Sequence, residues 1–89
     1  MKHRNLEVTF RNGKLLAAYL YLPRHPGDMS ARTVKRGEGL LIDFTADGRA
    51  IGIEITAPSR LSLEMLNRAL ATVNQAPATA DELGPLAAA

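Results

Sequence analysis

Residues 40–55 read LLIDFTADGRAIGIEI and consist of two apolar runs around an Asp-Gly pair. This pair favours a tight hairpin turn, because Asp and Gly tolerate the positive φ that such turns require. A two-residue loop sets apolar residues of the two strands opposite one another: Phe44 with Ile51, Ile42 with Ile53 and Leu40 with Ile55. A four-residue loop keeps the same phase, whereas a three-residue loop sets these core residues against Ala50 and Gly52. The stretch therefore predicts an antiparallel hairpin with one apolar face.

A second hairpin signal, Asn12-Gly13, lies between the apolar runs 6–10 and 15–22. A two-residue turn there predicts three pairs: Phe10 with Leu15, Val8 with Ala17 and Leu6 with Tyr19. Residues 23–28 have the composition of a surface loop, and residues 31–36 that of a strand that turns at Gly37-Glu38-Gly39. We therefore expect the strands to pair in sequential order, as a meander.

The apolar period changes after residue 55, which indicates a helix. Ser62 can cap this helix, which is expected to run from Ser62 to Asn74. Its apolar stripe consists of Leu63, Leu66, Leu70 and Val73. The predicted fold is α+β: a four- or five-stranded antiparallel β-meander packed with this one C-terminal α-helix. We expect one domain over residues 1–76 and an Ala-rich tail over 77–89 that is flexible or forms a short helical turn.

The composition offers little material for a large core. The 89 residues include two Phe, two Tyr and no Cys, so neither a disulfide nor a zinc–thiolate site can reinforce the fold. No apolar run is long enough to cross a bilayer, and the start of the chain lacks the apolar core of a signal peptide. We therefore expect a cytoplasmic protein with no membrane association, and no motif predicts a cofactor.

The strand over residues 15–22 is apolar on both faces. A strand with one solvated face would alternate with polar residues, and one helix does not easily cover both sides of a sheet. We expect a second subunit to cover the other side, as in a homodimer, through the helix or through one side of the strand: Leu16, Ala18, Leu20 and Leu22. The alternative is a strongly curled sheet in a monomer.

Basic residues are concentrated in the first half of the chain. Residues 1–39 carry eight Lys or Arg and three acidic residues, which gives a net charge of +5. Residues 40–89 carry three Lys or Arg and six acidic residues, which gives a net charge of −3. The eight cations are Lys2, Arg4, Arg11, Lys14, Arg24, Arg32, Lys35 and Arg36. A nucleic-acid-binding regulator is therefore the alternative to a protein-interaction domain. The other interpretation is a solvated face with a charged, protected sheet edge.

Catalytic groups are scarce, and we expect no enzymatic activity. His3 and His25 lie near the terminus and in a Pro-flanked loop, where no rigid neighbours hold a nucleophile beside a base. One constellation remains, in which Asp43 and Glu54 lie on the face opposite the apolar residues, beside the space left by Gly52. Two carboxylates there could serve acid–base chemistry or a hard metal ion.

A structural interpretation of this constellation is also open. Arg32 falls opposite Asp43 if Gly37-Glu38 is a two-residue loop, which would give a cross-strand ion pair. Gly52 would then mark a close approach by another backbone or a subunit. The candidate functional face comprises Arg32, Asp43, Asp47, Gly48, Gly52 and Glu54.

Residues 41–55 and the strand Ala18-Tyr19-Leu20-Tyr21-Leu22 resemble a small prokaryotic family, domain of unknown function 2283. The resemblance spans residues 6–57 and is most specific in the run Gly-Ile-Glu-Ile. The chain departs from the family where Thr45 replaces the second acid of an Asp-x-Asp pair and where residues 11–15 replace an Asp-rich stretch. The resemblance implies an antiparallel sheet with a helix, no assigned activity and, since some members lie beside small ribonuclease-like toxin genes, an antitoxin-like role. We therefore expect a self-associating protein-interaction domain, antitoxin-like or regulatory.

Overall fold

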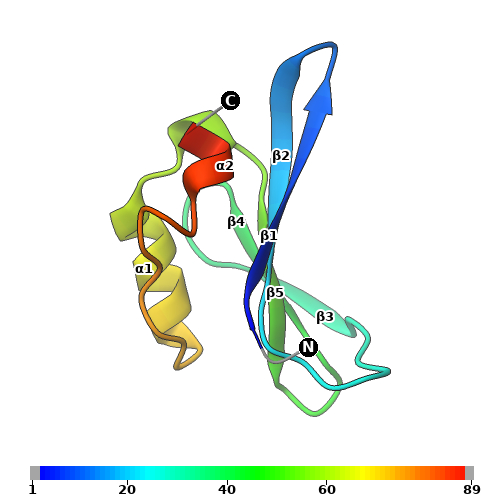
Figure 1. Ribbon diagram of the computed structural model, residues 1–89. Helices are drawn as coiled ribbons and strands as arrows, with labels where there is room; N and C mark the ends of the chain where they lie inside the picture. The colour runs from blue at the N-terminus through cyan, green and yellow to red at the C-terminus, as the bar shows by residue number, and fades with distance from the viewer. Residues whose placement is uncertain (1–2, 88–89) are drawn as a thin grey trace.

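The computed structural model describes residues 3–87, which fold as a five-stranded antiparallel sheet against one principal helix (Figure 1). The strands are β1 (Asn5–Arg11), β2 (Lys14–Tyr21), β3 (Arg32–Lys35), β4 (Leu40–Phe44) and β5 (Ala50–Ile55). The helical elements are η1 (Pro58–Arg60), α1 (Leu63–Thr72) and α2 (Gly84–Ala87). The predicted α+β class, with an antiparallel sheet and one main helix, is confirmed.

The predicted sequential strand order is wrong, because β5 lies between β2 and β4. The order in the sheet is β1-β2-β5-β4-β3. The most buried strands, β4 and β5, occupy the interior of the sheet, where both of their edges are paired. The short strand β3 exposes Arg32, Thr33 and Lys35 and lies at one edge. This arrangement keeps the apolar strands away from edges that water or another chain can reach.

The first hairpin has the predicted turn but a different phase beyond it. Asn12 and Gly13 have φ values of 53° and 74°, as a two-residue primed turn requires, and Phe10 lies opposite Leu15. Thr9, however, pairs with Ala17, so Leu16 is an extra residue on β2, a β-bulge. The bulge replaces two of the predicted pairs with Val8 opposite Ala18 and Leu6 opposite Leu20.

The second hairpin has a longer turn than the two-residue loop, and a bulge restores the expected phase. Thr45 and Arg49 bond across the turn, with N···O 2.9 Å, so the loop consists of Ala46-Asp47-Gly48. Phe44 therefore pairs with Ala50 and not with Ile51. A register shift at the next position then brings back the two remaining predicted pairs, Ile42 with Ile53 and Leu40 with Ile55.

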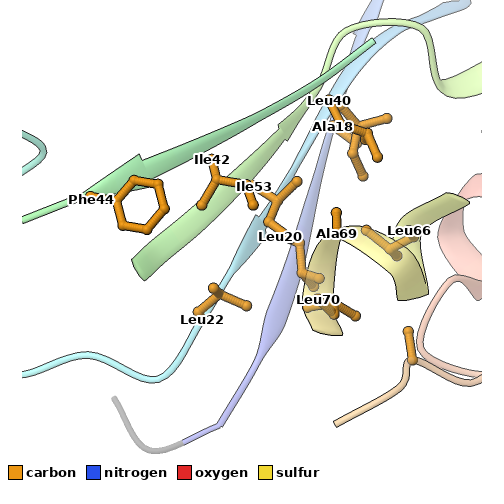
Figure 2. Packing of buried hydrophobic residues seen from close by; sticks show 12 residues of the cluster. Ala18, Leu20, Leu22, Leu40, Ile42, Phe44, Ile53, Leu66, Ala69 and Leu70 are labelled. Carbon is orange, nitrogen blue, oxygen red and sulfur yellow. The ribbon is translucent and has the colours of Figure 1, made fainter. Parts of the chain in front are cut away.

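Helix α1 begins as the sequence predicts and covers one face of the sheet. The Ser62 hydroxyl oxygen accepts a hydrogen bond from the backbone N–H of Met65 at 3.1 Å, which caps the helix. Leu66, Ala69 and Leu70 point toward the sheet and are buried (Figure 2). They belong to one apolar cluster with residues of β2, β4 and β5 and with Leu22 just after β2: Ala18, Leu20, Leu22, Leu40, Ile42, Phe44, Ile53 and Ile55.

The core contains three of the four residues predicted to form an interface, so that part of the prediction is wrong. Ala18, Leu20 and Leu22 lie beneath α1, and Leu20 is only 1% exposed. Leu16, in contrast, is 51% exposed. The bulge separates Leu16 from the other three, because it interrupts the alternation of side chains along β2.

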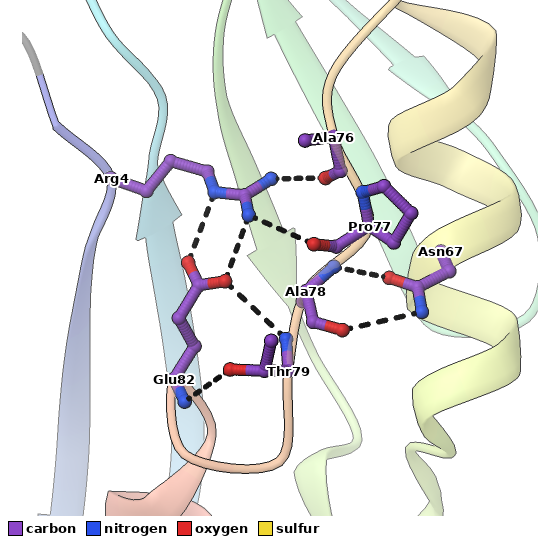
Figure 3. Close-up of polar contacts among 7 residues, drawn as sticks. All are labelled: Arg4, Asn67, Ala76, Pro77, Ala78, Thr79 and Glu82. Atoms are coloured by element: carbon purple, nitrogen blue, oxygen red, sulfur yellow. Dashed lines mark hydrogen bonds and ion pairs between the residues drawn. The ribbon is translucent and has the colours of Figure 1, made fainter.

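The tail after α1 packs on the body of the domain (Figure 3). Arg4 forms an ion pair with Glu82, with Nη2 and Oε1 2.8 Å apart, and also donates to the carbonyl oxygens of Ala76 and Pro77. The backbone N–H of Ala78 donates to Asn67 Oδ1 at 2.6 Å, and Ala78 is buried. Part of the tail forms the short helix α2. Lys2 and the last two tail residues lie outside the described range.

Within residues 3–87, no helix combines the length and apolar character needed to cross a lipid bilayer.

The bulge predicts unequal effects for two leucines on the same strand. Leu20→Ala should lower the free energy of unfolding by about 2–5 kcal/mol, because it leaves a cavity under α1. Leu16→Ala should change it by about 0.5 kcal/mol or less, because Leu16 is largely in water. Urea unfolding followed by circular dichroism measures both. Equal losses would show that Leu16 faces the core and would contradict the bulged register.

Candidate functional site

The face of the sheet turned away from α1 carries the two predicted carboxylates. Because alternate side chains of a strand point to opposite faces, Tyr19 lies on the face opposite Leu20, and its neighbours across the sheet are Glu54 and Asp43. We call Tyr19, Thr33, Asp43 and Glu54 the tyrosine–carboxylate cluster. Its members come from β2, β3, β4 and β5, so the cluster links four strands.

Asp43 is the centre of this cluster and is 7% exposed. Tyr19 Oη donates to Asp43 Oδ2 at 2.8 Å, and Thr33 Oγ1 donates to Asp43 Oδ1 at 2.6 Å. Both carboxylate oxygens are therefore bonded to neutral hydroxyl groups. Such bonds satisfy the hydrogen-bonding capacity of a buried carboxylate.

The predicted ion pair between Arg32 and Asp43 is wrong. The turn between β3 and β4 contains three residues, Gly37-Glu38-Gly39, because Arg36 bonds to Leu40 with N···O 2.9 Å. This turn is one residue longer than the ion pair requires, and the pairing shifts by one position. Thr33 lies opposite Asp43, while Arg32 lies opposite Phe44 with its guanidinium carbon 4.8 Å from the ring centroid. Arg32 makes a cation–π contact instead.

At Gly52 the sequence predicted a close approach by another backbone or a subunit, but the side chain of Tyr19 makes the approach instead. A Cβ atom on Gly52 would lie 1.9 Å from Tyr19 Oη and 2.2 Å from Tyr19 Cζ. Only glycine leaves room for the aromatic ring at this position. The space beside the two carboxyl groups is therefore filled by Tyr19.

Burial and mutual repulsion shape the ionisation of the cluster. The pKa of Glu54 is raised, first by burial between its strand neighbours Tyr19 and Leu41, and then by the charge of Asp43 and the hydrogen bond with it. Burial, aided by the hydrogen bond to Asp43, raises the pKa of Tyr19 to about 12. Tyr19 thus remains a hydrogen-bond donor to Asp43 throughout the neutral pH range.

The aromatic part of this face continues along β2. The rings of Tyr19 and Tyr21 meet edge to face, with centroids 4.7 Å apart, and the Arg24 guanidinium carbon lies 5.0 Å from the Tyr21 centroid. Arg24 also donates to the Ile51 carbonyl oxygen. The sequence reasoning missed this contact, although a basic residue three positions after a Tyr-x-Tyr strand is a usable signal.

Asp47 and Gly48, also predicted for the functional face, lie in the turn between β4 and β5. Asp47 accepts hydrogen bonds from Thr45 and Arg49, and Arg49 reaches across to both carboxylate oxygens of Asp28 at 2.7 and 2.9 Å. The hydrogen bonds from Arg49, with the backbone N–H of His25, lower the pKa of Asp28 to about 2. These residues tie the turn to the loop after β2 and are separate from the tyrosine–carboxylate cluster.

The cluster has the composition of a structural brace. Residues 3–87 bring together no group of three or more His, Asp or Glu side chains suited to a metal ion. The hydroxyl groups of Tyr19 and Thr33 both donate to Asp43, and Glu54 interacts electrostatically with Asp43. The arrangement places Glu54 close enough to Asp43 for the charge of Asp43 to help raise the pKa of Glu54.

A hollow lies on the other face of the sheet, between α1 and the turn that joins β3 to β4. It has a volume of about 520 Å³, and we call it the helix groove. Its lining includes Lys35, Arg36, Leu40, Met65 and Ala69. A second hollow of about 400 Å³ lies at the C-terminal end of α1 beside the turn between β4 and β5.

Comparison with known families supports the resemblance. Residues 17–58 match a family model described as "Protein of unknown function (DUF2283)". This stretch is therefore similar to the DUF2283 family over slightly less than half of the chain. This DUF2283 segment contains the whole tyrosine–carboxylate cluster, whereas β1 and α1 lie outside it. No curated protein and no solved structure matches the chain.

The contact at Gly52 predicts a coupling between two positions. Gly52→Ala should lower the free energy of unfolding by about 1–3 kcal/mol, because the added Cβ displaces the Tyr19 ring. The loss should be smaller in a Tyr19→Ala background, and a double-mutant cycle of urea unfolding measures the difference. Gly84→Ala is the matched control, since nothing lies near its Cβ position. Additive losses at positions 52 and 19 would contradict the contact.

The raised pKa of Glu54 predicts a pH-dependent gain for Glu54→Gln. A raised pKa in the folded state means that the parent protein loses stability as the pH rises from the ordinary glutamate pKa to the raised value. The Gln variant should therefore be the more stable protein at pH 7, and the difference should vanish below about pH 4.

Thermal unfolding of both proteins across this pH range measures the effect of Glu54→Gln. Glu38→Gln, in the exposed turn after β3, controls for the loss of one negative charge. A Gln variant that is less stable than the parent at neutral pH would show that the Glu54 charge is favourable in the fold.

Proposed function

We propose that this chain is a protein-interaction domain that self-associates as a dimer and has no enzymatic activity. The observation that carries the proposal is an apolar arm. Beyond the point where β5 ends, the hairpin of β1 and β2 projects past the rest of the sheet (Figure 1). Phe10 and Leu16 lie on this arm and are 52% and 51% exposed.

Part of the arm has only one partner strand in the sheet. β5 pairs with β2 only from Ala18 to Tyr21, so residues 14–17 pair within the sheet with β1 alone. Two-stranded ribbons are marginally stable in water by themselves. Exposed large apolar side chains on such a ribbon favour contact with another protein surface.

The free edge of β1 offers a way for two copies to pair. β1 is seven residues long, lies at the edge of the sheet and contains no Pro, the residue that blocks strand addition. Antiparallel pairing of two β1 strands centred on Thr9 sets Val8 of one copy opposite Phe10 of the other. It also sets Glu7 opposite Arg11 twice, once on each side of the two-fold axis. Apolar and charge complementarity thus agree in one register.

The antitoxin-like or regulatory role implied by the family resemblance is a finer form of this proposal. It requires a protein partner in addition to a second copy, and the exposed arm is compatible with both.

Nucleic-acid binding receives less support from the positions of the basic residues. Arg4 is paired with Glu82, Arg24 lies over Tyr21, and Arg32 lies over Phe44. These cations are therefore engaged in contacts within the fold and on different parts of it. A single basic surface with free cations is the usual footprint of nucleic-acid binding.

Size-exclusion chromatography with light scattering at micromolar concentration tests the dimer. The parent should elute as a dimer, and Phe10→Ser should weaken association about tenfold or more by removing a central apolar contact. Glu7→Arg or Arg11→Glu alone should weaken it by opposing like charges, and the double charge swap should restore it. Met29→Ser, which removes an exposed apolar side chain outside the arm, is the matched control.

A parent protein that is monomeric at these concentrations would contradict the proposal. Unchanged association in Phe10→Ser would place the interface elsewhere. A charge swap that fails to restore association would reject the pairing centred on Thr9.

A further inference from the structure

The helix groove lies at the edge of the sheet opposite the arm and takes no part in the proposed dimer. It opens between α1 and the end of β3, whereas β1 forms the other edge. Its volume of about 520 Å³ falls in the range of ligand-binding pockets, roughly 300–1,000 Å³. The groove can therefore accept several side chains of a second molecule.

The floor of the groove is apolar. Leu40 and Ala69 are buried and line it from β4 and α1, and Met65 is half-buried beside them. Methionine adapts its shape to different apolar partners because it is unbranched and flexible. No aromatic side chain is among the residues that line the groove, so the groove offers no platform for stacking nucleobases.

The rim of the groove is basic. Lys35 and Arg36 stand on the strand side, and within residues 3–87 neither of them forms an ion pair. Arg68 stands on the helix side, where its charge is shared with Glu64. Glu38 is the acidic residue among the lining residues. A ligand with apolar groups for the floor and negative charges for the rim is therefore complementary to the groove.

We propose that the helix groove binds an acidic amphipathic helical segment of another protein. A helix presents apolar side chains at spacings of three and four residues along one stripe, which suits a groove that runs beside α1. Its flanking Asp or Glu residues would meet Lys35 and Arg36.

A second copy of this chain does not fit the groove. The exposed apolar residues of the arm are flanked by Arg11 and Lys14, which would face the basic rim and repel it. The acidic pair Asp81-Glu82 is held on the tail by the ion pair with Arg4. The occupant is thus a different protein, and the inference goes beyond the proposed self-association.

Fluorescence anisotropy with a synthetic labelled peptide tests this inference. The probe is a helical peptide with Leu at every third and fourth position and Glu on both flanks of the stripe. Two control peptides have the same composition in scrambled order and Lys in place of each Glu. The full chain should bind the acidic amphipathic peptide at least tenfold more tightly than either control, and binding should weaken as salt increases.

Two variants and one matched control locate the site. Lys35→Glu/Arg36→Glu should weaken peptide binding about tenfold or more through charge reversal at the rim, and Met65→Ser should weaken it by removing part of the floor. Arg11→Glu/Lys14→Glu makes the same change of charge on the arm and should leave peptide binding intact even if it alters the oligomeric state. A loss of self-association through the arm can therefore be distinguished from a loss of peptide binding in the helix groove.

Several outcomes would overturn the inference. These are equal affinity for the three peptides, no binding at about 100 µM peptide in low salt, and undiminished binding to Lys35→Glu/Arg36→Glu. An oligonucleotide that binds the parent, competes with the peptide and loses affinity in the same variant would assign the basic rim to nucleic acid instead.

Discussion

One extra residue on β2, the bulge at Leu16, is the constraint on which the rest of the structure depends. It shifts the pairing of β1 by one position, so that Leu6 lies opposite Leu20 and not opposite Tyr19. The apolar side of β1 then faces the helix together with the apolar side of β2. Without the bulge, the two strands would present their apolar residues to opposite faces, and α1 could bury only one set.

The bulge also determines which side chains lie on the face of the sheet turned away from α1. Tyr19 points away from α1, lies over Gly52 and donates to Asp43. The hydroxyl groups of Tyr19 and Thr33 donate to the two oxygens of the buried Asp43 carboxylate. This brace stabilises the four strands it connects, at the cost of a disfavoured charge on Glu54.

The small core is extended by parts of the chain outside the family segment. Helix α1 covers the centre of the sheet, and the tail adds Ala78 with Leu83 and Leu86, held by the contacts of Arg4 and Asn67. These elements do not cover the two edges of the sheet, which expose different kinds of surface. The β1 edge ends in an apolar ribbon, and the β3 side ends in a groove with a basic rim. The molecule thus offers two surfaces of different chemistry, far apart in strand order.

The sequence by itself determined the local features: the Asn12-Gly13 turn, the Ser62 cap, and the pairs Ile42–Ile53 and Leu40–Ile55. These depend on neighbouring residues and on alternation within one hairpin, and a single sequence records both. Only the tertiary structure decided the strand order, the bulge at Leu16 and the one-residue shift that replaced the Arg32–Asp43 pair. Several registers and orders satisfy the same local patterns, and the choice among them depends on which apolar faces can be buried together under α1. For the same reason the sequence placed Asp43 and Glu54 side by side but could not show that Tyr19 fills the space over Gly52.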